Sequence, residues 1–148
     1  MKRVVTGYDQ DGRSVFVSTD EPTCGVTGED GGRITYCWET KGLPVMLGEQ
    51  KDPVLAMTTP FPGPDGTTFV IAQLPGHTQF GMHMSDTVDY LAILSGEMWL
   101  VLDSGTEVLL TPGDCVVQNG TLHAWHNRSP DPCVWSAALV GAKRQTEA

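Results

Sequence analysis

Two histidines and one aspartate stand out as residues that could do chemistry. These residues are His83, His123 and Asp89, which follows His83 by six positions. Two imidazoles and a carboxylate that converge form a 2-His-1-carboxylate set, which holds Fe(II) and leaves positions open for substrate or oxygen; imidazole also suits zinc, copper and nickel. The alternative is a pair of ordinary strand histidines, hydrogen-bonded in the core or at its rim. Residue types alone leave both interpretations open.

Side-chain alternation along a strand decides which neighbours share a face with these histidines. His123 shares its face with Trp125, whereas His126 points to the opposite face. By the same alternation, His83 shares its face with Ser85. A barrel interior that contains His123 therefore also contains Trp125.

The elements that must position these residues are predicted to be short strands. Period-2 alternation dominates, and no stretch has the periodicity of a long amphipathic helix. Residues 18–32 are expected to form a surface loop, and prolines are expected to make residues 40–66 a long irregular segment. Strands are predicted at 4–6 and 14–17 around a hairpin turn, and at 33–39, 68–74, 88–94, 97–103, 106–110, 115–118, 123–127 and 134–140. Short strands with regular turns indicate an all-β sandwich or barrel.

The composition of the chain excludes some classes of binding partner. With 9 Lys plus Arg and 18 Asp plus Glu, the formal net charge is −9, which argues against a nucleic-acid binder and against attraction to anionic membranes. No stretch approaches the apolar length of a transmembrane helix. The basic start is not followed by an apolar segment, so no secretory signal is predicted and a cytoplasmic location is expected.

Four cysteines, Cys24, Cys37, Cys115 and Cys133, show neither C-x-x-C pairing nor zinc-ribbon spacing. In a chain expected to stay in a reducing compartment, they are predicted to be free, buried thiols with no catalytic role.

Two segments around the histidines resemble the motifs of the cupins, a family of small β-barrel proteins. The six residues between Asp89 and Gly96 reproduce the Glu-to-Gly spacing of the first cupin motif, and His83 falls at the place of its first histidine. Residues 113–114 (Gly-Asp) and 120–127 (Gly-Thr-Leu-His-Ala-Trp-His-Asn) reproduce the second motif closely. The resemblance covers residues 68–140, about half of the chain.

The resemblance implies an all-β fold, a cupin-type double-stranded β-helix or jelly-roll barrel with an N-terminal strand extension. Within one domain, residues 1–66 would form a hairpin and irregular extension packed on the barrel, 67–141 the barrel core and 142–148 a flexible tail. By family analogy a homodimer is expected, with the proline-rich segment as the dimer contact.

The sequence departs from the family pattern at three positions. Ser85 replaces the second histidine of the first motif, Asp89 replaces its glutamate, and Gln118 replaces the proline of the second motif. His83, Asp89 and His123 remain as a three-ligand set for a divalent Fe, Zn, Mn or Ni ion. The alternative is a cupin pocket without a metal, in which the histidines act as hydrogen-bonding or acid–base groups.

Further residues are assigned to the pocket by position. Asn127 is a candidate to orient a ligating group through a hydrogen bond, and His126 and His77 are candidates for general acid–base work. The pocket lining is predicted to be aromatic and thioether-rich, from Trp125, Trp99, Tyr90, Phe80 and Met98 together with Ser85.

These expectations favour a small-molecule enzyme. The first hypothesis is a metal-dependent cupin with decarboxylase or other lyase chemistry on a cyclic or aromatic metabolite, in which the metal is a Lewis acid. The second is an Fe(II) dioxygenase. The third is a non-catalytic cupin that binds a small ligand and has lost its metal.

Overall fold

The computed structural model describes residues 1–44 and 51–144. In this part the chain forms strands and one short 3-10 helix, as the all-β prediction requires. The elements are β1 (Arg3–Tyr8), β2 (Ser14–Asp20), β3 (Gly25–Thr27), β4 (Arg33–Thr40), η1 (Pro53–Ala56), β5 (Thr67–Leu74), β6 (Thr78–His83), β7 (Thr87–Ser95), β8 (Met98–Leu102), β9 (Glu107–Leu110), β10 (Cys115–Gln118), β11 (His123–Asn127) and β12 (Cys133–Gly141).

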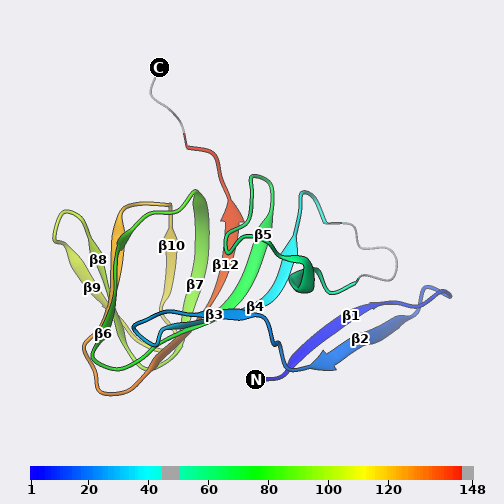
Figure 1. Ribbon diagram of the computed structural model, residues 1–148, viewed down its shortest axis with the longest axis horizontal. Coiled ribbons are helices and arrows are strands. Elements are labelled where there is room, and N and C mark those ends of the chain that lie inside the picture. Colours follow the sequence, from blue (N-terminus) through cyan, green and yellow to red (C-terminus); the bar gives the residue numbers. More distant parts are fainter. Residues whose placement is uncertain (45–50, 145–148) are drawn as a thin grey trace.

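Two antiparallel sheets build the barrel (Figure 1). The larger sheet has the strand order β10-β7-β12-β5-β4-β3, and the smaller has the order β6-β11-β8-β9. Both sheets contain strands that are distant in sequence, since β12 lies between β5 and β7 and β11 lies between β6 and β8. The predicted all-β barrel is confirmed, and its interior lies between the two sheets.

The core follows from side-chain alternation. On β5, the buried residues Val70, Ala72 and Leu74 alternate with the more exposed Phe69 and Gln73. A strand with this pattern buries one face and presents the other outward. The same period buries residues of β7 and β12 against the interior, so the larger sheet has an inner face that is packed and an outer face that is not.

Glycine is required at the turn before β11. Gly120 has φ +63°, and a Cβ atom there would lie 2.6 Å from the carbonyl oxygen of Ser85. The positive φ and the close approach both favour glycine, because it has no Cβ. The turn holds the start of β11 beside the segment that follows β6.

Part of the N-terminal region that was predicted to be a loop is a strand of the barrel. Residues 25–27, expected in a surface loop, form β3, and with β4 they extend the larger sheet. The backbones of β3 and β4 approach each other closely at Gly25, since a Cβ atom on this residue would lie 2.5 Å from the Ile34 carbonyl oxygen. Residues 78–83, for which no separate strand was predicted, form β6.

Within residues 41–44 and 51–66, the described part of the proline-rich segment, there is one regular element, the helix η1. Asp52 caps it by accepting a hydrogen bond from the Val54 backbone N–H at 3.1 Å, and Pro53 suits the first helical position because its missing N–H is not needed there. The prediction that prolines break every regular element was therefore wrong at 53–56. Residues 45–50 of the predicted irregular segment lie outside the described residues.

The hairpin β1–β2 forms a sheet of its own and projects from the barrel on the side of β4 (Figure 1). Its base is fixed by Arg3, whose guanidinium donates to both carboxylate oxygens of Asp20, at 2.8 and 2.6 Å, and to the Cys37 carbonyl at 3.2 Å. Arg3 also pairs with Asp52 beside η1. The charged cluster ties the hairpin to the barrel.

The cysteines are free, but not all of them are buried. Cys37 and Cys133 are buried, Cys24 is half-buried and Cys115 is exposed. Cys115 lies on the edge strand β10, where alternation points it outward, so the prediction of burial was wrong at this position. Of the predicted flexible tail, residues 145–148 lie outside the described residues. No helix in the described ranges has the length and apolar character that crossing a bilayer needs.

Candidate functional site

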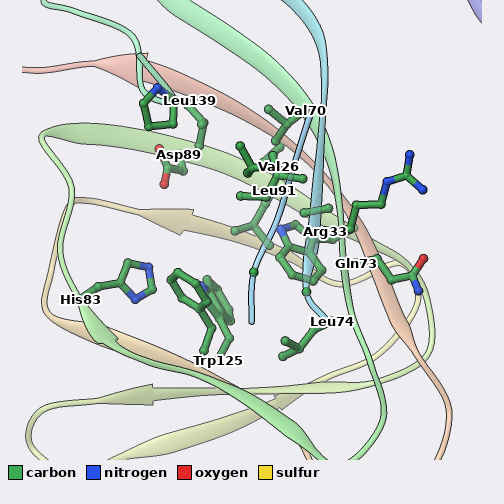
Figure 2. A pocket seen from close by; sticks show the side chains of 18 of the residues that line it. Val26, Arg33, Val70, Gln73, Leu74, His83, Asp89, Leu91, Trp125 and Leu139 are labelled. Carbon is green, nitrogen blue, oxygen red and sulfur yellow. The ribbon is translucent and has the colours of Figure 1, made fainter. Parts of the chain in front are cut away.

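A cavity of about 330 Å³ lies between the inner faces of the two sheets. Both sheets line it: Leu91 and Trp135 belong to the larger sheet, and Phe80 and Trp125 to the smaller. Figure 2 shows His83 and Trp125 on one side of the cavity and Val70 and Leu91 on the opposite side. The walls are mainly apolar. Polar side chains interrupt them from both sheets, among them Tyr36, His83, Ser85, Asp89 and His123, and the lining also includes Thr27, Asp30, Arg33 and Gln73. This is the usual composition of a small-molecule site.

His83 and His123 are brought together by strand pairing. The two residues are directly opposite each other in the antiparallel pair β6–β11, and directly opposite residues share one face of a sheet. Their ring centroids are 4.3 Å apart, with the planes tilted by 51°.

Each of these imidazoles is oriented by a backbone carbonyl. The His83 Nδ1 lies 2.8 Å from the Gly81 carbonyl oxygen, and the His123 Nδ1 lies 2.8 Å from the Thr121 carbonyl oxygen. A carbonyl oxygen only accepts, so Nδ1 carries the proton in both rings. In the neutral form of either ring, Nε2 then has a lone pair available to a ligand.

The surroundings of His123 favour its neutral form. Burial lowers the pKa of His123, and the nearby His83 lowers it further. Two positive charges at this separation would repel each other in a poorly hydrated site. The pair therefore presents at least one neutral imidazole to the cavity.

Aromatic rings hold the histidine pair in place. Phe80 meets His83 edge-on at 4.6 Å between centroids, and Trp125 meets His123 in the same way at 5.2 Å. Trp135 lies 6.3 Å from Trp125 and extends the aromatic wall toward the larger sheet. Edge-to-face contacts of this kind are favourable and restrict ring orientation.

Asp89 lines the same cavity from β7, where it pairs with Leu139 and Gln118. Figure 2 shows it beside Leu139, on a different strand from His83. Burial raises the pKa of Asp89, and its Oδ1 is buried with no hydrogen-bond partner in residues 1–44 and 51–144. The site thus contains an unpaired carboxyl oxygen as well as the imidazole pair.

The proposed ligands His83, Asp89 and His123 do not form a single group in this arrangement. Within residues 1–44 and 51–144, no three His, Cys, Asp or Glu side chains are grouped so that they could hold a metal ion. The two imidazoles have the carbonyl-anchored Nδ1 typical of metal ligands, but Asp89 does not join them. Two donors fall short of the three that an open protein metal centre normally supplies. The donor set does not fit such a metal.

The remaining pocket predictions divide between the cavity and other places. Phe80, Ser85 and Trp125 line the cavity. Met98 is fully buried in the core, and Tyr90 is exposed on the outer face of the larger sheet. The ring of Trp99 carries the Arg128 guanidinium at 4.6 Å from its centroid. Trp99, Tyr90 and Met98 are therefore not among the residues that line the cavity.

The two acid–base candidates also lie elsewhere. His126 is on β11, paired with Trp99 and Gln79, and alternation directs it away from the His123 face. His77 is an exposed residue of the turn before β6, with φ +57°, and its N–H donates to the Ser129 carbonyl at 2.9 Å. Neither residue lines the cavity.

Asn127 is buried and bonded to the chain rather than to a histidine. Its Nδ2 donates to the carbonyl oxygens of Leu74 and Asp131, at 3.1 and 2.8 Å. Its Oδ1 accepts from the backbone N–H and hydroxyl of Ser129, at 3.0 and 2.8 Å. The amide fixes the turn between β11 and β12.

Sequence reasoning missed Tyr36 and Trp135. Both lie on strands of the larger sheet, β4 and β12, far in sequence from the histidines. Alternation predicts that each has one buried face, but only the strand order shows that this face borders the cavity. No local motif marks either residue.

Comparisons with known proteins agree with this architecture. A family model described as "Cupin domain" matches residues 69–140. "Phomopsin biosynthesis cluster protein C'" of Diaporthe leptostromiformis is 37% identical over 136 residues, covering 86% of this chain and 70% of that protein. The "cupin-domain-containing oxidoreductase fogC" of Aspergillus ruber is 35% identical over 129 residues, covering 84% of this chain and 63% of that protein.

Among solved structures, a cupin 2 conserved barrel domain protein from Salinispora arenicola matches with a TM-score of 0.51 at 16% identity. The match covers 77% of this chain and 79% of that chain. At this identity the likeness concerns the fold alone.

Proposed function

The chain belongs to the cupin superfamily, and from this premise we propose that it is an enzyme acting on a small, largely apolar cyclic or aromatic metabolite. The histidine pair His83–His123 is its acid–base group. One observation carries the proposal: two imidazoles 4.3 Å apart, each anchored through Nδ1, leave Nε2 available at the wall of an apolar cavity.

The pair suits proton transfer. The Nε2 lone pair of one ring can take a proton from a hydroxyl or an activated carbon of the substrate and return it to another atom. Proton removal followed by return is what eliminations and isomerisations require. The carbonyls at Nδ1 stabilise the imidazolium that forms, and the aromatic walls exclude water from the exchange. Lyase or isomerase chemistry is therefore the first choice of reaction class.

An oxidoreductase is the second candidate, and the names of relatives favour it. Relatives from Aspergillus ruber and Hypocrea virens, 35% and 29% identical, are named cupin-domain-containing oxidoreductases. The two reaction classes give products of different mass, because an isomerisation conserves mass, an elimination loses a fragment, and an oxidation gains oxygen or loses hydrogen. A binding cupin without chemistry, the third hypothesis, would give no product.

The test is a product screen by liquid chromatography and mass spectrometry. Purified chain is incubated with cyclic and aromatic hydroxy- and keto-compounds, beside His83→Ala, His123→Ala and the control His126→Ala. We expect either cavity variant to lower turnover by about 100-fold or more, since general acid–base groups contribute at least this much. The control should retain wild-type turnover. Equal loss in all three variants, or turnover unchanged in both cavity variants, would refute the assignment.

A further inference from the structure

A polar group in the cavity wall opposite the smaller sheet has no hydrogen-bond partner among the described residues. Tyr36, on β4, lines the cavity and is only 6% exposed. Its hydroxyl is buried with no hydrogen-bond partner. Leaving such a group unpaired destabilises a folded protein, so a hydroxyl in this state at a ligand cavity points to a partner that arrives with the ligand.

We propose that the Tyr36 hydroxyl recognises an oxygen atom of the bound metabolite, which makes Tyr36 a specificity-determining residue of the site. This inference rests on the proposed function, because it places the ligand in the cavity that the histidine pair shares. A phenol both donates and accepts hydrogen bonds, so it fits either a hydroxyl or a carbonyl oxygen.

The residues that line the cavity indicate the chemical character of the remainder of the ligand. Around Tyr36 the lining is aliphatic and aromatic, including Val70, Leu74, Trp125 and Trp135. The charged side chains of the lining are of both signs, Asp30, Asp89 and Arg33, so the cavity has no excess of positive charge. A chain of net charge −9 does not favour an anionic ligand either. The ligand class is therefore a neutral ring compound, mostly hydrocarbon, with at least one oxygen placed for Tyr36 while another part reaches the imidazoles.

The chain contains a matched control for this proposal. Thr68 also has a buried hydroxyl oxygen without a partner and is fully buried. Thr68 does not line the cavity, although it lies on β5, the strand adjacent to β4. Removing the hydroxyl from Tyr36 or from Thr68 deletes the same kind of unpaired group, but only the first deletion affects a ligand.

The experiment compares Tyr36→Phe with Thr68→Val, using 2-naphthol and the isosteric 2-methylnaphthalene as probes in ligand-observed NMR titrations. We expect Tyr36→Phe to weaken 2-naphthol binding about 3- to 10-fold, the equivalent of one neutral hydrogen bond. Binding of 2-methylnaphthalene should not change. Thr68→Val should bind both probes as the wild type does.

The possible failures are distinguishable. If Tyr36→Phe binds both probes with wild-type affinity, or weakens both equally, Tyr36 does not recognise oxygen and the inference fails. The proposed function fails separately, when the histidine variants keep wild-type turnover. If neither probe binds wild-type protein while turnover is found, the ligand class is wrong, and the inference fails with it.

Discussion

Replacement of Asn127 by alanine should be among the most destabilising single changes in the chain. The side chain is 1% exposed and makes four hydrogen bonds, two as donor and two as acceptor. The bond to the Leu74 carbonyl is buried, so its loss costs about 1–3 kcal/mol, and each of the other three contributes about 0.5–1.5 kcal/mol. Together they predict a loss of about 4 kcal/mol in the free energy of unfolding.

The assay is urea unfolding followed by tryptophan fluorescence, with thermal melts in parallel. For a chain of this length, about 4 kcal/mol corresponds to a melting temperature roughly 8–16 °C lower. Asn127→Asp keeps the size and the acceptor oxygen of the side chain but removes the donor nitrogen. It therefore turns a carboxylate oxygen toward the carbonyls of Leu74 and Asp131. We expect it to be at least as unstable as Asn127→Ala. A loss of less than about 1 kcal/mol in either variant would refute the assigned network.

Three further predictions concern acid stability, thiol reactivity and metal removal. Arg3 lowers the pKa of Asp20 below its ordinary value of 3.8. The ion pair therefore stabilises the fold above pH 3.8, and this stabilisation is lost as the pH falls through the lowered pKa. Asp20→Asn should have a lower melting temperature than wild type at neutral pH and the same melting temperature in acid. Iodoacetamide should label the exposed Cys115 in the folded state but Cys133 only on unfolding. Cys133 is buried, and burial raises the pKa of its thiol to about 11. Equal labelling rates of the two thiols, measured by mass spectrometry, would contradict this prediction. Chelation of divalent ions should leave turnover unchanged, and turnover that is lost and then restored by one divalent ion would contradict the donor-set argument.

The strands of the C-terminal half could be predicted from the sequence, because each strand is marked by the residues within it and by the turns beside it. Alternation within 68–74 and 134–140, and turns at positions such as Gly96 and Gly120, define strand after strand. The strand order is not local, since β12 lies between β5 and β7. Only the resemblance to a known family pointed to a jelly-roll arrangement of these strands.

The site was predictable where strand parity and motif coincided. His83, His123 and Trp125 lie in the cavity as parity placed them. Asp89 follows a turn, and its position relative to the histidines depends on how two different sheets face each other, which no spacing encodes. Tyr36 was missed for the same reason, because it comes from a strand outside the region of resemblance.

Trp99 and Tyr90 show the limit of proximity in sequence. Both lie close along the chain to motif residues, but Tyr90 is on the outward phase of its strand, and Trp99 lies beneath Arg128. Period-2 alternation, applied to Asp89 and Tyr90 together, already separates their faces.

The most direct test of the central claim is a long-range ¹H–¹⁵N NMR spectrum of the histidine rings, recorded near neutral pH without and with 2-naphthol. We expect the His123 ring to be neutral with its proton on Nδ1. We also expect the Nε2 signals of His83 and His123 to shift on binding while those of His126 do not. A proton on Nε2 of neutral His123, or binding that leaves both cavity rings unchanged, would contradict the claim that this pair is the reactive group of the site.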